Sequence, residues 1–425
     1  MKAAPQFPAP DDGRAPLRRR WLMIGFAFVA TLINYLDRQV LSVVVTAPEF
    51  KAAVPLTEET YGYVTSAFML AYAVMNGLSG PFIDRVGTKI GYAACMLWWS
   101  LAGIAHAWAR GPLSLGIFRF LLGAGEAGNW PAAAKLVGEW FPPKERALAS
   151  GLFNSGAAIG AVVSTPVIAW LVLGWGWRAA FVVMGVLGLV WIAAWWACYR
   201  TPPAETADEA QAERVPVREL IRTRFVVAFT VSKVFMDPVW YFFVFWFPKY
   251  LSEEHHFSLK EIGWKGWIPY FTAALGNLAG GMLTARLIKG GVAVPVARKA
   301  STAVFALLML ATIPAILTRD AWLAIALVSL TTFGYTGYTA NTLAFPADVF
   351  PKSAIASVWE LASMGSGFGG MCFMALSGWL IARYGYTPVF IGYGIMPVLA
   401  LALVIFGIGP LHRRPPTATP AAPAI

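Results

Sequence analysis

The stretch GEWFPPKERALASG, Gly138 to Gly151, has an echo in the second half of the chain, where Ala347 to Val358 read ADVFPKSAIASV. Both stretches place an acidic residue two positions before Phe-Pro, then a lysine, then small residues. When Phe141 is superposed on Phe350, the apolar runs that precede them also come into register, with glycines on glycines. Such self-similarity predicts a chain built from two copies of one structural unit.

Further positions support this repeat. The register aligns Gly125 with Gly334, Gly128 with Gly337 and Glu126 with Tyr335. Two weaker matches pair GPFIDRVGTK, 80–89, with GMLTARLIK, 281–289, and NYLDR, 34–38, with KVFMDP, 233–238. Repeats arranged as parallel copies occur in transporters whose substrate site lies between the two halves.

The composition indicates a membrane protein, because 58% of the residues are hydrophobic and only 13% are charged, against about 25% charged residues in soluble domains. Apolar runs long enough to cross about 30 Å of hydrocarbon recur along the chain. The first run is too long for the apolar core of a cleaved signal peptide, so we expect it to be retained. We predict twelve runs, at 21–47, 60–83, 90–109, 113–138, 147–174, 178–199, 225–251, 262–288, 294–317, 321–346, 353–382 and 387–409.

A polar segment, Arg200 to Arg224, divides these runs six and six, and its prolines and charges are typical of a linker. The predicted fold is therefore an all-α integral membrane protein with twelve transmembrane helices in two six-helix bundles. The predicted parts are an N-terminal tail at 1–20, a first bundle at 21–199, a linker at 200–224, a second bundle at 225–411 and a C-terminal tail at 412–425.

The net charge of +11 follows from topology rather than from nucleic-acid binding. With twelve spans, both termini lie on one side, and most of the 33 lysines and arginines fall in the tails and loops of that side. Loops rich in these residues stay in the cytoplasm, so both termini are predicted to be cytoplasmic. The three cysteines lie in apolar runs without metal-ligand spacing, and the ATP-binding pattern GxxxxGK[ST] is absent from the sequence. We expect no metal and no cofactor.

Several motifs carry a resemblance to a known family. Gly80, Asp84, Arg85, Gly87 and Lys89 have the spacing of the loop motif of the major facilitator superfamily. NYLDR, RFLLGAGEAGNWPAAAKLVGEWFPPKERALASGLFNSG and DPVWYFFVFWFPKYL are similar to its anion:cation symporter branch, most of all to hexuronate and other sugar-acid transporters. The resemblance extends from Trp21 to about Ile408. It implies a secondary transporter of the bacterial inner membrane that imports a hexuronate- or aldonate-like monocarboxylate with protons, by alternating access. The 80–89 loop is expected to latch the cytoplasmic side in the outward-open state.

Among the charged residues inside the predicted spans, four suggest a function: Asp37, Arg38, Arg119 and Glu126. A charge costs about 2.5–3.5 kcal/mol at the centre of the bilayer. Arg119 and Glu126 are seven residues apart and therefore share one face of the fourth span. The small residues around Glu126 let a neighbouring helix approach, so Glu126 can face Asp37 and Arg38 of the first span. Arg38 is predicted to be unpaired within the membrane, with a fork of donors that suits a carboxylate ligand.

The resemblance implies that Arg38 binds the substrate carboxylate and that Asp37 and Glu126 carry the coupled protons, with Arg119 beside them. We expect Arg38 to favour the ionised form of its neighbour Asp37, and the drier setting of Glu126 to favour its protonated form. Tyr35 and Tyr72 match family positions that contact substrate; packing as buried aromatic residues is the equally weighted alternative.

The tenth and fifth spans offer polar groups for the other end of a sugar acid. Tyr335, Thr339 and Asn341 lie close together in the tenth span, and Asn154 lies near the head of the fifth. Trp240 follows Asp237 in the seventh span and forms either an aromatic wall or part of the core. Lys233 and Asp237 are spaced i,i+4, so we expect them to neutralise each other and to be structural.

Two departures from the family pattern bear on the substrate. Trp359 and Glu360 stand in the eleventh span where small or apolar residues are expected, and Ala157 and Ala158 stand in the fifth where relatives often carry an amide. A glutamate that faced the cavity would repel an acid. The identity of the acid is therefore left open.

Two other functions are considered beside proton-coupled uptake. One is transport or exchange of another organic anion; the other is a membrane receptor that binds an acid without moving it. The sequence contains no nucleophile–base or metal constellation, so an enzyme is not expected. The expected partners are a small organic anion, protons and the lipid bilayer, with the proton gradient as energy source and the monomer as the working unit.

Overall fold

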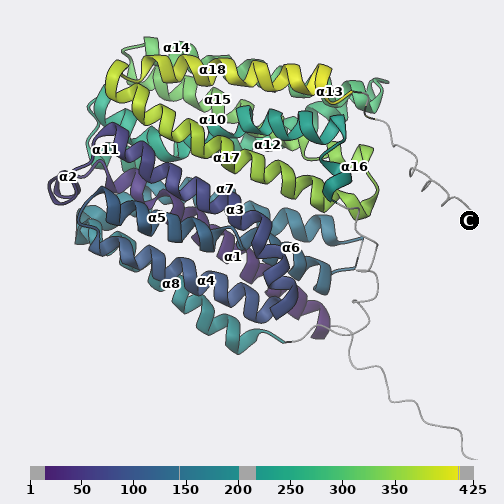
Figure 1. The fold of residues 1–425 in the computed structure, drawn as a ribbon, viewed down its shortest axis with the longest axis horizontal. Coiled ribbons are helices and arrows are strands. Elements are labelled where there is room, and N and C mark those ends of the chain that lie inside the picture. The colour runs from purple at the N-terminus through teal and green to yellow at the C-terminus, as the bar shows by residue number, and fades with distance from the viewer. Residues whose placement is uncertain (1–14, 143, 201–216, 410, 412–425) are drawn as a thin grey trace, which may run out of the picture.

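A computed structural model describes residues 15–142, 144–200, 217–409 and 411 of the chain. These residues form helices joined by short turns, and most of the long helices run roughly parallel to one another (Figure 1). The N-terminal helices, purple to blue, gather in one half of the molecule, and the C-terminal helices, green to yellow, gather in the other. The first 14 residues, most of the predicted linker and the predicted C-terminal tail lie outside the described residues.

The helices before residue 200 are α1 (Ala15–Val44), α2 (Pro48–Ala53), α3 (Glu58–Val86), α4 (Thr88–Ala105), α5 (Pro112–Glu126), α6 (Asn129–Trp140), α7 (Arg146–Trp175) and α8 (Trp177–Cys198). Those after residue 216 are α9 (Val217–Leu220), α10 (Arg224–Glu254), α11 (Leu259–Lys265), α12 (Ile268–Lys289), α13 (Val294–Leu308), α14 (Thr312–Leu317), α15 (Ala321–Thr342), α16 (Phe345–Val349), α17 (Lys352–Tyr384) and α18 (Thr387–Ala402). Short 3-10 segments follow α4 and α13, and a π-helical segment follows α18.

Each predicted apolar run coincides with one helix or with two consecutive helices. Among the described residues, eight helical segments are long and apolar enough to cross a membrane. The predicted runs outside this set contain α1, the α5–α6 pair, α12 and α15. They are less apolar or interrupted, and each of them supplies residues to the polar interior described below.

The N-terminal boundary differs from the prediction. Helix α1 begins at Ala15, so 15–20 continue the helix instead of belonging to a tail. Arg20 in this first part of α1 forms an ion pair of 2.8 Å with Glu145, the N-cap residue of α7, which gives the extension a polar partner. The start of α1 and the end of α18 lie at the same end of the molecule, on the right in Figure 1.

The aligned glycines of the repeat have matching structural roles. A Cβ atom on Gly125 would lie 2.8 Å from Trp99 of α4, and one on Gly334 would lie 2.7 Å from the carbonyl oxygen of Phe305 in α13. Helices α4 and α13 correspond to the third and ninth predicted spans. Both glycines therefore allow a close approach to the preceding span of their own half, as a repeated unit requires.

The predicted 80–89 loop is almost entirely helical, which corrects that expectation. Residues up to Val86 complete α3, and Lys89 lies in the first turn of α4. The reversal between the helices is made at Gly87, whose φ of 82° is available to glycine at little cost. Asp84 forms an ion pair of 3.2 Å with Lys135 of α6, in the second part of the fourth predicted span. Arg85 is exposed, and Gly80 lies one helical turn before Asp84.

The two halves meet closely at the end opposite to the start of α1. A Cβ on Gly62 of α3 would lie 2.8 Å from the Cα of Gly378 in α17, so glycine is needed at this crossing. Nearby, Lys249 of α10 forms an ion pair of 2.5 Å with Glu58 of α3 and a second one with Glu253. These contacts join helices of different halves and close this end of the interior.

We expect Lys249→Met to loosen this end, because it removes the cation that holds Glu58 and Glu253 together and leaves two carboxylates facing each other. The measurement is thiol labelling of a cysteine placed at Ala273, which lines the interior, in a chain without its three native cysteines. An impermeant reagent added on the side opposite to the termini should react faster than in the parent chain. Lys265→Met, which removes a lysine whose ion pair among the described residues is with Glu261 of its own helix α11, is the control. Equal labelling in both variants would contradict the role of Lys249.

Candidate functional site

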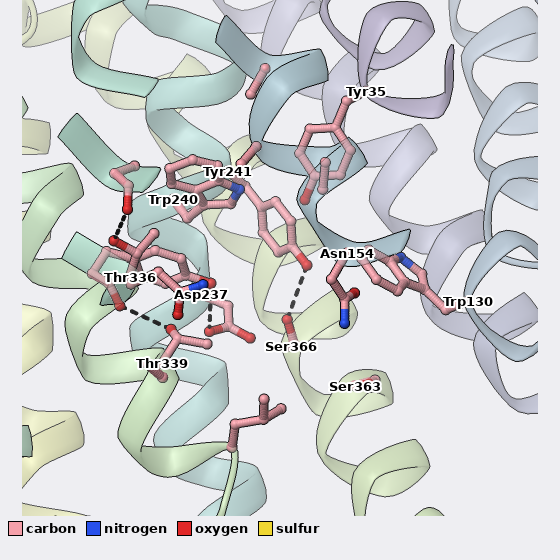
Figure 2. Close-up of a pocket in the computed structure, with 18 of the residues that line it drawn as sticks. Tyr35, Trp130, Asn154, Asp237, Trp240, Tyr241, Thr336, Thr339, Ser363 and Ser366 are labelled. Atoms are coloured by element: carbon pink, nitrogen blue, oxygen red, sulfur yellow. Dashed lines mark hydrogen bonds between the residues drawn. The ribbon is translucent and has the colours of Figure 1, made fainter. Parts of the chain in front are cut away.

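A cavity of about 430 Å³ lies between the two halves. Helices α1, α3, α6 and α7 form one wall, and α10, α12, α15 and α17 form the other. Figure 2 shows aromatic, hydroxyl and amide side chains from both walls around this space. Six of the predicted substrate-binding residues line it: Tyr35, Arg38, Tyr72, Asn154, Trp240 and Tyr335. A seventh, Asn341, does not.

Arg38 is the basic residue of the cavity wall, and its side chain is buried. Its Nε and Nη2 atoms lie 3.0 and 2.9 Å from Oε2 of Glu126, and Nη2 also donates to Oδ1 of Asn34 at 3.2 Å. The guanidinium lies 4.9 Å from the ring centroid of Tyr72 and 5.1 Å from that of Tyr35. Arg38 is thus held by a carboxylate, an amide and two aromatic rings at once.

The prediction that Arg38 is unpaired was therefore wrong. The side chains of Arg38 and Glu126 are 3% and 0% exposed, and an isolated charge at such a depth is unstable unless an opposite charge meets it. Small residues near Glu126 bring α5 close to α3: a Cβ on Gly123, one turn before Glu126, would lie 2.4 Å from the carbonyl oxygen of Phe68 in α3. Arg119 also faces α1, as the seven-residue spacing predicted, and donates from Nη2 to the Arg38 carbonyl oxygen at 3.2 Å.

Asp37 lies apart from the guanidinium of Arg38, which pairs with Glu126 instead. Its Oδ1 atom lies 3.5 Å from the position of a Cβ on Gly103 in α4. Its Oδ2 atom is buried and receives no hydrogen bond from the described residues. Adjacent residues of a helix point about 100° apart, so Arg38 faces the cavity and Asp37 faces α4. The guanidinium of Arg38 therefore pairs with a carboxylate oxygen of Glu126 and not with Asp37.

On the opposite wall, Asp237 of α10 accepts two hydrogen bonds at Oδ1, from Lys233 Nζ at 3.2 Å and from the Tyr335 hydroxyl at 3.1 Å. The predicted pairing of Lys233 with Asp237 is present. However, Asp237 lines the cavity, which the sequence interpretation missed. The repeat could have indicated this position of Asp237, because Tyr335 aligns with Glu126 and each of these two residues contacts the first long helix of its own half.

Trp240 and Tyr335 form an aromatic wall beside Asp237. Their rings are stacked, with centroids 5.2 Å apart and planes inclined by 10°. Tyr241, the next residue of α10, shares a hydrogen bond of 3.2 Å with Ser366 of α17 (Figure 2). The two alternatives left open for Trp240, wall or core, are both realised, because its ring packs on Tyr335 and also lines the cavity.

Asn341 has a structural position instead of the expected one in the cavity. Its Nδ2 donates to the carbonyl oxygens of Gly337 at 2.9 Å and Gly280 at 3.3 Å, and its Oδ1 accepts from Thr284. Thr339 does line the cavity. Asn341 lies two residues further along the helix, so its side chain points roughly 200° away from that of Thr339. Asn341 therefore faces α12 and ties it to α15.

The residues that depart from the family pattern divide between cavity and periphery. Trp359, Ala157 and Ala158 line the cavity. Glu360 is not among the lining residues; its Oε1 lies 3.9 Å from the position of a Cβ on Gly80, near the end of α3.

Two half-molecules of membrane-type helices around a central polar cavity define a secondary transporter fold. The chain belongs to the Major Facilitator Superfamily, whose family model matches residues 27–297 and 239–424. A hexuronate transporter of Escherichia coli strain K12 is 30% identical over 414 residues, which cover 93% of this chain and 95% of that one. A probable galactarate/D-glucarate transporter of the same strain is 28% identical, with 95% and 98% covered. A hexuronate transporter of Bacillus subtilis is 30% identical, with 92% and 96% covered.

The fold is also found among solved structures. A bacterial homolog of the human lysosomal transporter Spinster, in an inward-facing and occupied conformation, superposes with a TM-score of 0.72 at 21% identity, covering 92% of this chain and 95% of that one. The resemblance to sugar-acid transporters drawn from the motifs is thus confirmed by relatives that extend over nearly the whole chain. These relatives are transporters, and the expected location, a multi-pass protein of the bacterial inner membrane, agrees with them.

We expect Glu126→Ala to lower the stability of the fold, because it leaves Arg38 buried without its carboxylate partner. Breaking one side of a buried pair costs about 3–5 kcal/mol, so the thermal unfolding midpoint in detergent should fall clearly. The double variant Arg38→Met/Glu126→Ala should recover part of the loss. Glu145→Ala is the control, since the Arg20–Glu145 pair is partly exposed and contributes about 0–1 kcal/mol. A double variant less stable than Glu126→Ala would count against the pairing.

Proposed function

We propose that this protein is a secondary transporter that imports a sugar monocarboxylate, hexuronate- or aldonate-like, together with protons. The observation that carries the proposal is the buried guanidinium of Arg38 on the cavity wall, held by a carboxylate that a substrate carboxylate can replace. Relatives named as hexuronate, galacturonate and D-galactonate transporters support the class of substrate.

The cavity suits a sugar acid at both ends. The fork of Arg38 can donate two parallel hydrogen bonds to a carboxylate. Hydroxyl and amide groups of Asn154, Thr339 and Ser366 are available to sugar hydroxyls, and the stacked rings of Trp240 and Tyr335 offer an apolar face to the carbon skeleton. Tyr35 and Tyr72 flank the guanidinium and would contact the carboxylate end.

Coupling to protons follows from competition for Arg38. An ionised Glu126 occupies the guanidinium, so a substrate carboxylate must displace it. Protonation of Glu126 removes the competing charge and frees Arg38, so that proton and substrate bind together. Asp37 is proposed as a second proton carrier, because its buried Oδ2 accepts no hydrogen bond from the described residues and can therefore take up a proton. Arg119 would hold the backbone of α1 in place during these steps through its hydrogen bond to the Arg38 carbonyl oxygen.

The transport cycle is proposed to be alternating access, in which bundles 21–199 and 225–411 rock about the cavity and 200–224 connects them. All twelve runs would span the membrane, with both termini in the cytoplasm. The segment with Gly80, Asp84, Arg85, Gly87 and Lys89 would latch the cytoplasmic side in the outward-open state. No cofactor is required in this scheme, and a monomer contains the complete pathway.

We expect Arg38→Lys to weaken binding of D-galacturonate roughly 10- to 100-fold, because lysine keeps the charge but loses the fork. Loss of one charge-assisted hydrogen bond costs about 1.5–3 kcal/mol. Isothermal titration calorimetry on the purified protein measures the change. Arg178→Lys is the control, since Arg178 donates to the Ala107 carbonyl oxygen and is not among the residues that line the cavity. Unchanged affinity in Arg38→Lys would remove this residue from the substrate site.

We expect Glu126→Gln to abolish accumulation driven by a pH gradient while exchange of internal for external substrate continues, because exchange needs no net proton movement. Gradient-driven uptake and counterflow are measured in the same proteoliposomes, with Glu261→Gln, outside the cavity, as control. Accumulation at the wild-type level in Glu126→Gln would show that another group carries the proton. Absence of counterflow in the wild type would favour a receptor over a transporter.

A further inference from the structure

Of the described residues that line the cavity, Asp237 is the one that carries a carboxylate and Arg38 the one that carries a permanent cation. They belong to α10 and α1, the first long helices of the two halves, so they stand on opposite walls. The cavity is therefore polarised, with a cation toward one end of a bound ligand and an anion toward the other.

The free face of Asp237 is turned to the cavity. Both hydrogen bonds that it accepts from the described residues, from Lys233 and Tyr335, end on Oδ1, and Oδ2 accepts none. Lys233 is 4% exposed and is not among the lining residues; its ammonium lies 5.6 Å from the ring centroid of Trp359. A ligand in the cavity thus meets the carboxylate oxygen of Asp237 before it meets the lysine behind it.

We propose that Asp237 determines substrate specificity by contacting the end of the substrate that is remote from Arg38. It accepts a hydrogen bond from a terminal hydroxyl group and rejects a second carboxylate. This inference rests on the proposed function, because it assumes that a sugar acid binds with one carboxylate at Arg38.

The selectivity follows from hydrogen-bonding capacity and charge. An ionised carboxylate only accepts hydrogen bonds, so a hydroxyl group complements Asp237 whereas a second ionised carboxylate offers no donor. Two carboxylates also repel each other strongly in a cavity of low dielectric constant. Rejection by an unpaired charge is a common source of specificity.

The surroundings hold Asp237 in a defined direction. Tyr335 donates to its Oδ1 and is itself held by stacking on Trp240, and Lys233 fixes the same oxygen from one turn earlier in α10. The relatives of this chain include proteins named for monoacids and for the diacids galactarate and D-glucarate. The shared fold therefore leaves the choice between mono- and diacids to individual cavity residues.

The test compares galactarate, which has carboxylates at both ends, with D-galactonate and D-galacturonate, which have one. Binding to the full-length protein in detergent is measured by isothermal titration calorimetry at neutral pH. The wild type should bind the better of the two monocarboxylates at least about tenfold more tightly than galactarate. In Asp237→Asn this ratio should fall about tenfold or more, because the anion is lost and Lys233 loses its partner. Glu261→Gln removes a carboxylate that is not among the residues lining the cavity and should keep the preference.

Each outcome either supports or overturns the role of Asp237 in specificity. A wild type that binds galactarate as tightly as the monocarboxylates overturns the role of Asp237, even if the variant fails to fold. An unchanged ratio in a folded Asp237→Asn variant overturns it as well. If the wild type binds none of the three acids while its thermal unfolding shows a folded protein, the proposed function itself fails, and the assignment of Asp237 falls with it.

Discussion

The ion pair between Arg38 and Glu126 is the contact on which the rest of the site depends. Both side chains are buried, and neither charge is stable there alone. Once paired, they fix the relative position of α1 and α5 and hold Arg38 at the edge of the cavity with Tyr35 and Tyr72 around it. Asn34 and Arg119 add hydrogen bonds to the side chain and backbone of the same arginine. The pair is therefore a structural constraint and, in the proposed function, also the group that a substrate carboxylate engages.

Glycine allows α7 to pack closely against α1, the helix that carries Arg38. A Cβ on Gly156 of α7 would lie 2.4 Å from the carbonyl oxygen of Phe28 in α1, and a Cβ on Gly160 would lie 2.8 Å from that of Leu32. Arg38, Glu126, Asn34 and Arg119 all belong to one half of the molecule. A rigid rocking of the halves leaves their contacts intact, whereas the pair of Lys249 with Glu58 crosses the halves and has to break.

The all-α fold and the place of six of the seven predicted substrate-binding residues on the cavity wall were predictable from the sequence, because apolar runs, a repeat and intramembrane charges are local or periodic signals. The pairing of Arg38 with Glu126 was not, since Glu126 stands 88 residues away and only the packing of α5 on α1 decides which neighbour it meets. Arg38 was expected to favour the ionised form of its neighbour Asp37, but adjacent helical residues face different helices. The predicted position of Asn341 in the cavity was wrong for a related reason. Its residue type and its helix suit the cavity, but its side chain turns away because it lies two positions from a lining residue.

The two halves place chemically different groups at related positions. In the first half, Glu126 meets a cation on the first long helix, so a titratable acid and a permanent charge share one contact. In the second half, the aligned residue is Tyr335, a neutral donor, and it meets Asp237, a carboxylate already paired with Lys233. A proton can alter the first contact, because ionisation of Glu126 decides whether Arg38 is occupied. The second contact offers no such competition, so its contribution is to shape and charge the wall that a ligand touches. Divergence of one repeated contact thus separates, within the proposed scheme, the half that responds to protons from the half that selects the substrate.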